Sequence, residues 1–199
     1  MLGSGDGEKN MESYLERLKS DHLRMRRILL QLDRDLQLSQ EPDADLGEAM
    51  TQVVNALCFI AGYPEQWHHP LEDLLFRRLL EIDAPCAKSV EQLLDEHESM
   101  ALQTGFLLQR FEQALQSREP PDSLLISESH AYFRIQTEHQ RREADNVFPV
   151  MAAFLDSSDW RRAERTLLAT PSEASLCRYY QHLYQSTVNR EPPGYRQVK

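Results

Sequence analysis

The sequence has few cysteines, few glycines and no cysteine pair of the kind that holds a metal. Its three cysteines, Cys58, Cys86 and Cys177, are scattered and form no CxxC motif. Such a set indicates free thiols in a reducing cytosol and argues against a thiolate metal site. Glycine accounts for 7 of 199 residues, whereas Leu, Glu, Gln, Arg and Ala abound, and no strand-like alternation is present. This composition favours helix, and we predict an all-α fold.

Long apolar runs and a basic charge balance are missing too. No stretch approaches the ~18 apolar residues of a membrane span, and the first residues lack the apolar segment of a signal peptide. Lys and Arg number 22 against 32 Asp and Glu, which gives a net charge of -10. This balance argues against nucleic acids and anionic membranes as partners. We expect a soluble, cytoplasmic protein that meets cations.

Apolar residues recur in steps of three and four, which is the pattern of amphipathic helices. The pattern predicts four long helices, over residues 11–38, 46–82, 87–116 and 123–155. Pro64 and Pro70 each lack a backbone donor, so we expect a break between Gly62 and Pro70. The connections, of about 4–7 residues, are short. These features favour an antiparallel, up-and-down four-helix bundle.

A single folded domain is expected at this length, and its helices span residues 11–156. Residues 1–10 are Gly-rich and polar, and we expect them to form a flexible leader. From residue 157 to 199 the helical pattern becomes shorter and indicates a C-terminal extension and tail. Short helices are predicted there over 160–168 and 173–188, with three packing residues: Tyr179, Tyr180 and Tyr184.

Two His-x-x-x-Glu pairs carry the chemistry of the sequence: His68–Glu72 and His139–Glu143. Residues four apart share one face of a helix, so each pair directs an imidazole and a carboxylate toward one point. Both groups are ligands for iron, manganese and zinc. Spacing alone is a weak signal, because chance gives about one such pair in a chain of this composition. Whether these pairs indicate a metal site depends on whether each histidine lies on the apolar face of its helix.

Each of the four predicted helices has one histidine on its apolar face: His22, His68, His97 and His139. A histidine on a core face costs desolvation unless its nitrogens have partners. One such histidine is ordinarily structural, but four near the middle of a bundle converge on one volume. We therefore predict a metal site with six ligands: His22, His68, Glu72, His97, His139 and Glu143.

This donor set suits two metal ions. Glu72 and Glu143 can each bridge two metals, whereas a neutral imidazole nitrogen binds only one. Two carboxylates against two divalent ions leave the site positive and under-coordinated, which favours an exogenous oxo or hydroxo bridge. Imidazole together with carboxylate suits iron, with manganese or zinc as substitutes.

His69 has three open interpretations. It lies about 100° around the helix from His68, so it is a surface residue, a donor to a ligand, or a seventh ligand. With Asp73 it also forms a rival His-x-x-x-acid pair. We prefer the pair His68–Glu72 because it continues the apolar face of the second helix. The remaining two histidines are expected at the surface: His130 and His182.

The ordered set of His22, His68-x-x-x-Glu72, His97 and His139-x-x-x-Glu143 resembles the hemerythrin-like family, also called HHE cation-binding domains. The flanking HHPLEDLLF and EHQRREADNVFP segments add to the resemblance, which covers about residues 11–155 and is nearest to the broader bacterial type. Membership of this family implies a four-helix bundle around a non-haem di-iron centre. It also implies reversible binding or sensing of O2, or responses to nitric oxide, peroxide or iron supply.

Two departures from the respiratory hemerythrins matter. Those proteins carry a second histidine one turn from that of the third helix, where this chain has Leu93 and Ala101. Their last carboxylate lies five residues after its histidine, whereas here Ala144 holds that position and Glu143 lies four residues after His139. We therefore expect one ligand fewer, and an open position that makes the metal more reactive or more easily lost.

Three functions are compatible with these residues. The leading expectation is a di-iron protein that binds or senses a small ligand and is not an enzyme, with Met25, Phe76 and Met100 either keeping the pocket dry or simply packing. The second is an enzyme that uses the same ligands: a ferroxidase, a peroxidase, or a protein that delivers iron or repairs iron–sulfur clusters. The third is a metal-free helical interaction module in which the glutamates satisfy the histidines.

Overall fold

Helices make up nearly all of the chain that the computed structural model describes, which is residues 5–43, 45–168 and 185, and no strand occurs among them. The predicted all-α class is therefore confirmed. The long helices are α1 (Gly5–Leu38), α2 (Leu46–Tyr63), α3 (His69–Glu81), α4 (Ala87–Ser117) and α5 (Ser123–Arg142). Two π-helical segments, η1 (Pro64–His68) and η2 (Glu143–Val147), and two shorter helices, α6 (Phe148–Phe154) and α7 (Ser157–Leu168), complete the order.

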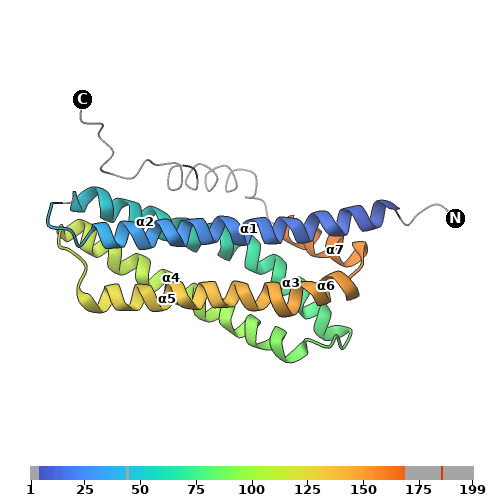
Figure 1. Cartoon of the computed structure of the whole chain (residues 1–199). Helices are drawn as coiled ribbons and strands as arrows, with labels where there is room; N and C mark the ends of the chain where they lie inside the picture. The colour runs from blue at the N-terminus through green and yellow to red at the C-terminus, as the bar shows by residue number, and fades with distance from the viewer. Residues whose placement is uncertain (1–4, 44, 169–184, 186–199) are drawn as a thin grey trace.

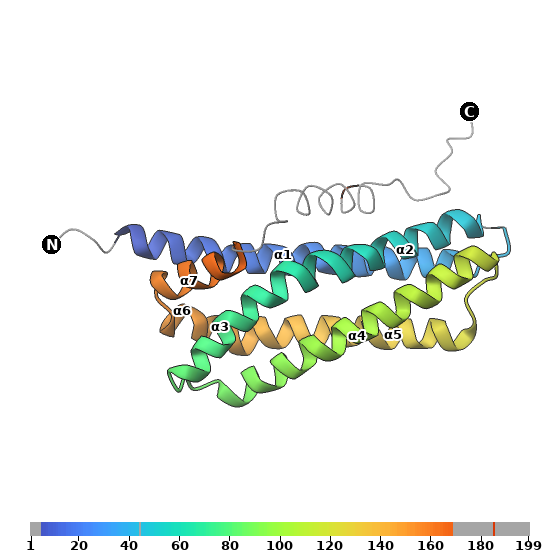
Figure 2. The same ribbon diagram turned by 180° about the vertical axis from the view of Figure 1, so that it is seen from behind.

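These elements form four long helical segments around a common core. Figure 1 shows α1 running the length of the molecule, while α2 and α3 form one bent segment and α5 and α6 another. Helix α1 contacts α2 and α5, α4 contacts α2, α3 and α5, and α3 also contacts α6. Helix α7 packs on α1 and α3, as Figure 2 shows from behind. A four-helix bundle is consistent with this arrangement.

Helices α2 and α5 begin at the predicted residues, 46 and 123, and each has an aspartate as its capping residue. The carboxylate of Asp45 accepts a hydrogen bond from the backbone N–H of Glu48 (3.0 Å), and that of Asp122 from the N–H of Leu125 (2.7 Å). These contacts satisfy backbone donors that a helix start leaves free. Helix α1 begins at Gly5 rather than at residue 11, so part of the segment expected to be a flexible leader is helical. Extending an existing helix avoids the cost of nucleation, because each residue that becomes ordered adds one hydrogen bond.

A proline, Pro70 or Pro149, lies two residues after the end of each π-helical segment. Proline has no N–H, and its ring clashes with the carbonyl four residues earlier, so a regular α-helix cannot continue through it undisturbed. The widened turns before Pro70 and Pro149 relieve this conflict, since the N–H of His69 bonds to the carbonyl of Pro64 and that of Phe148 to Glu143. The first segment confirms the break expected between Gly62 and Pro70. The second was not expected.

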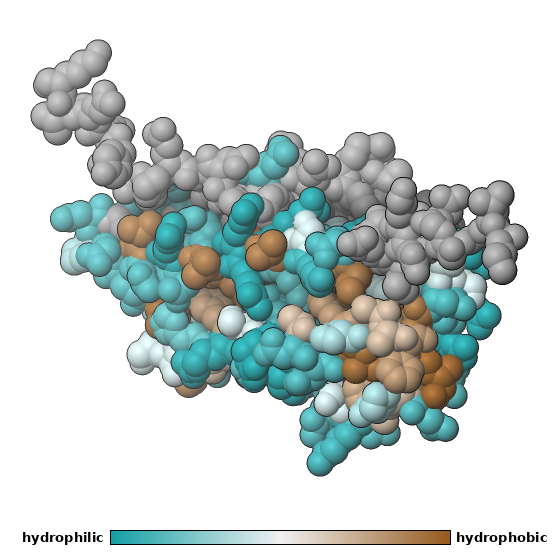
Figure 3. All heavy atoms as spheres, turned by 45° about the vertical axis from the view of Figure 1, so that its right-hand side comes forward, coloured by the Kyte–Doolittle hydropathy of each residue, from teal (hydrophilic) through white to brown (hydrophobic). Residues whose placement is uncertain are grey.

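The apolar core is divided into two clusters along the bundle. One gathers residues of α1, α2, α4 and α5, including Leu32, Leu57 and Phe111. The other gathers residues of α1, α3, α4, η2, α6 and α7, including Phe76 and Trp160. On the face shown in Figure 3 the surface is mainly hydrophilic, with separate hydrophobic patches. No described helix is both long and apolar enough to span a bilayer.

The cysteines of the described residues are free thiols, and one of the two predicted C-terminal helices is present. Cys58 is half-buried and Cys86 is buried, and neither forms a disulfide. Cys177 and the helix predicted over 173–188, with its three tyrosines, lie outside the described residues, apart from Gln185. The helix predicted over 160–168 is present as α7.

We expect Phe111→Ala to lower the free energy of unfolding by about 3–5 kcal/mol, because Phe111 is fully buried and truncation leaves a cavity in the first core cluster. Phe106→Ala is the matched control on the same helix, since that ring is 53% exposed. It should change stability by less than about 1 kcal/mol. Urea denaturation of the full chain followed by circular dichroism measures both, and equal losses for the two variants would contradict the assignment of the core.

Candidate metal centre

A layer of polar side chains lies between the two apolar clusters. Five imidazoles and two carboxylates form it, contributed by α1, η1, α3, α4, α5 and η2. Every one of these seven side chains is buried, and the two carboxylates are 0% exposed. The residues are His22, His68, His69, Glu72, His97, His139 and Glu143. All six ligands predicted from the sequence are therefore brought together, and His69 joins them.

The two glutamates span this layer from opposite sides. One oxygen of Glu143 lies 3.2 Å from Nε2 of His22, and the other lies 3.0 Å from Nε2 of His139 and 3.4 Å from Nε2 of His97. Glu72 is arranged alike, with Oε1 3.1 Å from Nε2 of His68 and Oε2 3.7 Å from Nε2 of His97. Each carboxylate thus faces both halves of the layer, which is the geometry that a bridging ligand needs.

The donor atoms form groups in which every atom lies within 4.8 Å of the others. The first group holds His22, His68 and Glu72, which we call the two-histidine position. A second group holds three imidazoles and is called the three-histidine position: His69, His97 and His139. A third group, made of Glu72, His97 and Glu143, links them. The donor groups thus lie next to one another within the layer.

His69 is buried in the same layer as the six predicted ligands, so the structure does not place it at the surface. Its ring stacks on that of His97 at a centroid distance of 4.2 Å. The expectation of one ligand fewer, drawn from Leu93 and Ala101, stays a prediction, and the structure adds His69 of the second segment as a buried imidazole beside the predicted ligands. Consecutive residues of a regular helix point about 100° apart. The π-turn η1, which ends at His68, changes the helix phase so that both neighbouring histidines are buried in the same layer.

Four further carboxylates surround the layer, and each faces Nδ1 of one of its histidines. His97 donates to Asp73 (2.6 Å) and His139 donates to Glu96 (2.9 Å). His69 lies 3.3 Å from Glu65, and His68 lies 3.5 Å from Asp21. We call these four residues the outer carboxylates. A carboxylate behind a histidine fixes its orientation and leaves Nε2 free for a cation.

These contacts do not pair His69 with Asp73. The ion pairs of the described residues join His69 to Glu65 and Asp73 to His97 instead. Asp21, Glu65 and Glu96 were missed from the sequence. A signal was present for Glu65, which lies one helical turn before His69, whereas Asp21 and Glu96 face histidines of other segments.

Opposite charges in the layer stabilise one another. Burial lowers the pKa of His68, but the carboxylates of Glu72 and Asp21 outweigh this effect and raise it to about 10. Burial is likewise outweighed at His97, where the hydrogen bond to Asp73 helps to raise the pKa to about 10. Burial favours the protonated form of Glu72, yet the facing imidazoles lower its pKa to about 2. Imidazolium protons thus balance buried carboxylates, and a binding cation takes over this role and releases protons.

The layer also contains buried polar atoms without a hydrogen-bond partner among the described residues. They include Nε2 of His22, both ring nitrogens of His68, and both carboxylate oxygens of Glu72. Buried polar atoms are nearly always paired, so such a cluster calls for an explanation. These atoms face one another at distances of 3.1–3.5 Å, as a ligand set does around a cation. Imidazole nitrogens and carboxylate oxygens suit iron, manganese and zinc, and the residues fit such an ion.

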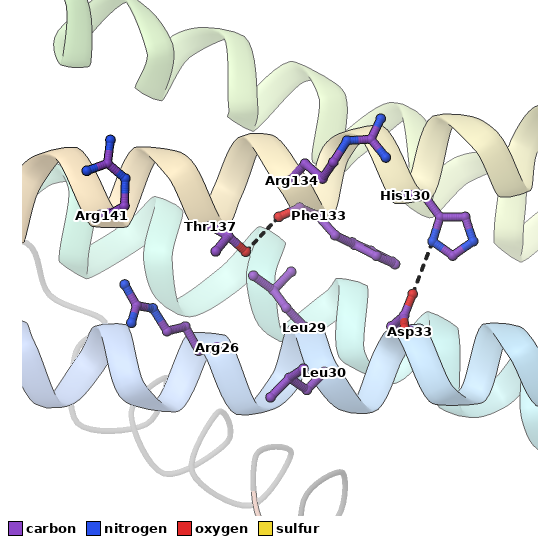
Figure 4. Close-up of a pocket in the computed structure, with 9 residues that line it drawn as sticks. All are labelled: Arg26, Leu29, Leu30, Asp33, His130, Phe133, Arg134, Thr137 and Arg141. Atoms are coloured by element: carbon purple, nitrogen blue, oxygen red, sulfur yellow. Dashed lines mark hydrogen bonds and ion pairs between the residues drawn. The ribbon is translucent and has the colours of Figure 1, made fainter.

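His130 lies outside the centre, in a groove of about 550 Å³ between α1 and α5. Figure 4 shows its ring pointing toward Asp33, and the two groups are 3.1 Å apart. The His130 side chain is 38% exposed, in agreement with the expected surface position. Arg26, at the other end of the groove, donates a hydrogen bond to Gln140 (3.2 Å). His182 lies outside the described residues.

Comparison with known proteins bears on this centre. The model of the hemerythrin HHE cation binding domain matches residues 13–151, which is well over half of the chain. All seven residues of the polar layer and all four outer carboxylates fall within the matched region. No curated protein and no solved structure matches the chain. The extent of the family match shows that the chain belongs to the hemerythrin HHE cation-binding domain family.

Proposed function

We propose that this chain is a non-haem di-iron protein that binds or senses O2 or a related small ligand, such as nitric oxide or peroxide, or reports the iron or redox state. The observation that carries the proposal is the pair of carboxylates, Glu72 and Glu143, each facing imidazoles of both positions. A pair of ferrous ions held by these residues would supply two electrons to an exogenous ligand. The protein residues hold the ions, orient their ligands and exclude water.

The two positions differ in the number of donors that the protein offers. Three imidazoles serve one position, whereas the other has only His22 and His68. With the two carboxylates shared, the two-histidine position is one donor short of the other. The proposed binding place for the exogenous ligand is therefore the two-histidine position. Neutral nitrogen and carboxylate oxygen donors favour iron, with manganese or zinc as substitutes.

Apolar surroundings support a ligand-binding role. Met25, Phe76 and Met100 are each no more than 2% exposed. The two apolar clusters lie on either side of the polar layer and limit the access of water. Water access assists the loss of electrons from ferrous centres, so a dry pocket favours a longer-lived adduct. The proposal also includes a cytoplasmic location, which we infer from the cysteine usage. It further includes an antiparallel order of the four helical segments.

We expect Glu143→Gln to reduce the iron content of the anaerobically reconstituted full chain from about two ions to one or fewer, because it removes a shared negative ligand. Glu138→Gln is the matched control, since Glu138 is exposed and pairs with Arg141 on the same face of α5. Elemental analysis measures both. Wild-type protein that retains no iron, or a Glu143→Gln variant with unchanged iron content, contradicts the proposal.

His69→Leu tests the seventh donor. Loss of this imidazole weakens the three-histidine position but leaves His22, His68 and Glu72 in place, so we expect about one ion per chain. His130→Leu removes a histidine outside the centre and should leave the iron content at the wild-type level. The metal-free interaction module predicts no bound iron in any of these proteins.

The rival enzymatic function uses the same residues and is separated from ligand binding by turnover. Reduced, iron-loaded protein that binds O2 reversibly, with the ferrous spectrum restored under argon, supports binding or sensing. Repeated consumption of hydrogen peroxide, or release of iron after oxidation, supports a peroxidase, ferroxidase or iron-delivery function. Absorption spectroscopy combined with a peroxide electrode distinguishes these outcomes.

A further inference from the structure

The outer carboxylates are distributed unevenly over the two positions. Three of them, Glu65, Asp73 and Glu96, face histidines of the three-histidine position. Only Asp21 faces a histidine of the two-histidine position, and at 3.5 Å it is the most distant of the four. The contacts to His97 and His139 are hydrogen bonds, at 2.6 and 2.9 Å.

We propose that this uneven set of outer carboxylates makes the centre electronically unequal, so that the ion at the three-histidine position is the first to be oxidised. The inference rests on the proposed di-iron function and deepens it. Oxidation of each ion from Fe2+ to Fe3+ releases one electron to an external acceptor, with no bond to the protein formed or broken. The outer carboxylates affect how readily that electron leaves.

The physical reason lies in the hydrogen bond behind each imidazole. An N–H that is donated to a carboxylate makes the opposite ring nitrogen a better electron donor, which raises ligand basicity. A fixed negative charge nearby also favours a trivalent ion over a divalent one. Both influences lower the reduction potential, and both act mainly on the three-histidine position.

The outer carboxylates also differ in how far their charge is already neutralised. Asp21 lies 3.5 Å from Arg24 and accepts a hydrogen bond from the hydroxyl of Tyr63 (2.9 Å). Glu96 is shared with Arg142. Among the described residues, Asp73 has no ion pair other than that with His97. Asp73, like Glu65, therefore has a single ion pair among these residues, with its histidine, whereas Asp21 and Glu96 each share their charge with a further partner.

Redox titration of the Asp73→Asn variant tests the inference. The full chain is loaded with ferrous iron without air, its iron content is measured, and the two one-electron midpoints are determined with mediators. We expect Asp73→Asn to disfavour the first oxidation about tenfold, which equals a rise of about 59 mV in the first midpoint. Asp21→Asn should mainly shift the second midpoint, and by less.

The chain offers a matched control in Asp33. Its carboxylate faces Nδ1 of His130 at 3.1 Å, which repeats the same pairing away from the centre. Asp33→Asn should leave both midpoints unchanged. Because Asp73→Asn can weaken iron binding, Glu96→Gln provides a second variant with the same expected direction and a smaller shift, since Arg142 shares that carboxylate.

The outcomes separate the two proposals. Wild-type protein without bound iron overturns the proposed function. Iron bound at the wild-type level with an unchanged first midpoint in both Asp73→Asn and Glu96→Gln overturns the inference alone. Equal shifts from Asp73→Asn and Asp21→Asn on the same midpoint also overturn it, because the two positions would then be equivalent.

Discussion

The burial of Glu72 and Glu143 among five imidazoles is the constraint on which the remaining structure depends. An isolated buried carboxylate is very costly, so each must face cationic groups or a metal ion. The apolar clusters on either side offer no such partners. The imidazoles come from every long helical segment, and therefore all four segments have to meet at this level in one register. A shift of any segment by one residue would remove a nitrogen from a buried carboxylate.

The interruptions of the helices lie at the level of this polar layer and are explained by two prolines. A regular helix through Pro70 or Pro149 would clash with the carbonyl four residues earlier. Pro70 lies between His69 and Glu72, and Pro149 lies six residues after Glu143. The π-turns before them therefore lie at the level of the polar layer. The extra residue in each turn alters which neighbours share a face. The segment η1 buries His68 and His69 together, and η2 begins at Glu143 itself.

The fold could be predicted from the sequence because its signals are local. Steps of three and four apolar residues gave the helices, and Asp45 and Asp122 mark two of their starts as capping residues. The meeting of His22, His68, His97 and His139 followed from one position per helix. The role of His69 could not be derived, since it depends on the phase shift of a π-turn. Asp21, Asp73 and Glu96 each face a histidine on another segment, and spacing along one helix does not contain that information.

These contacts between segments form a nearly closed sequence around the bundle. Asp21 of α1 faces His68 of η1, Asp73 of α3 faces His97 of α4, and Glu96 of α4 faces His139 of α5. The circle is completed between α5 and α1 by a different chemistry, since Arg26 donates to the amide oxygen of Gln140.

That last contact brings no further carboxylate to the centre. The negative charge of the outer set therefore gathers on the side of α3, α4 and α5, where the three-histidine position lies. The two-histidine position, which has fewer donors, is also the less negative one. Under the proposed function, the ion at the three-histidine position would be the first to give up its electron, and the open place for an exogenous ligand would lie at the two-histidine position.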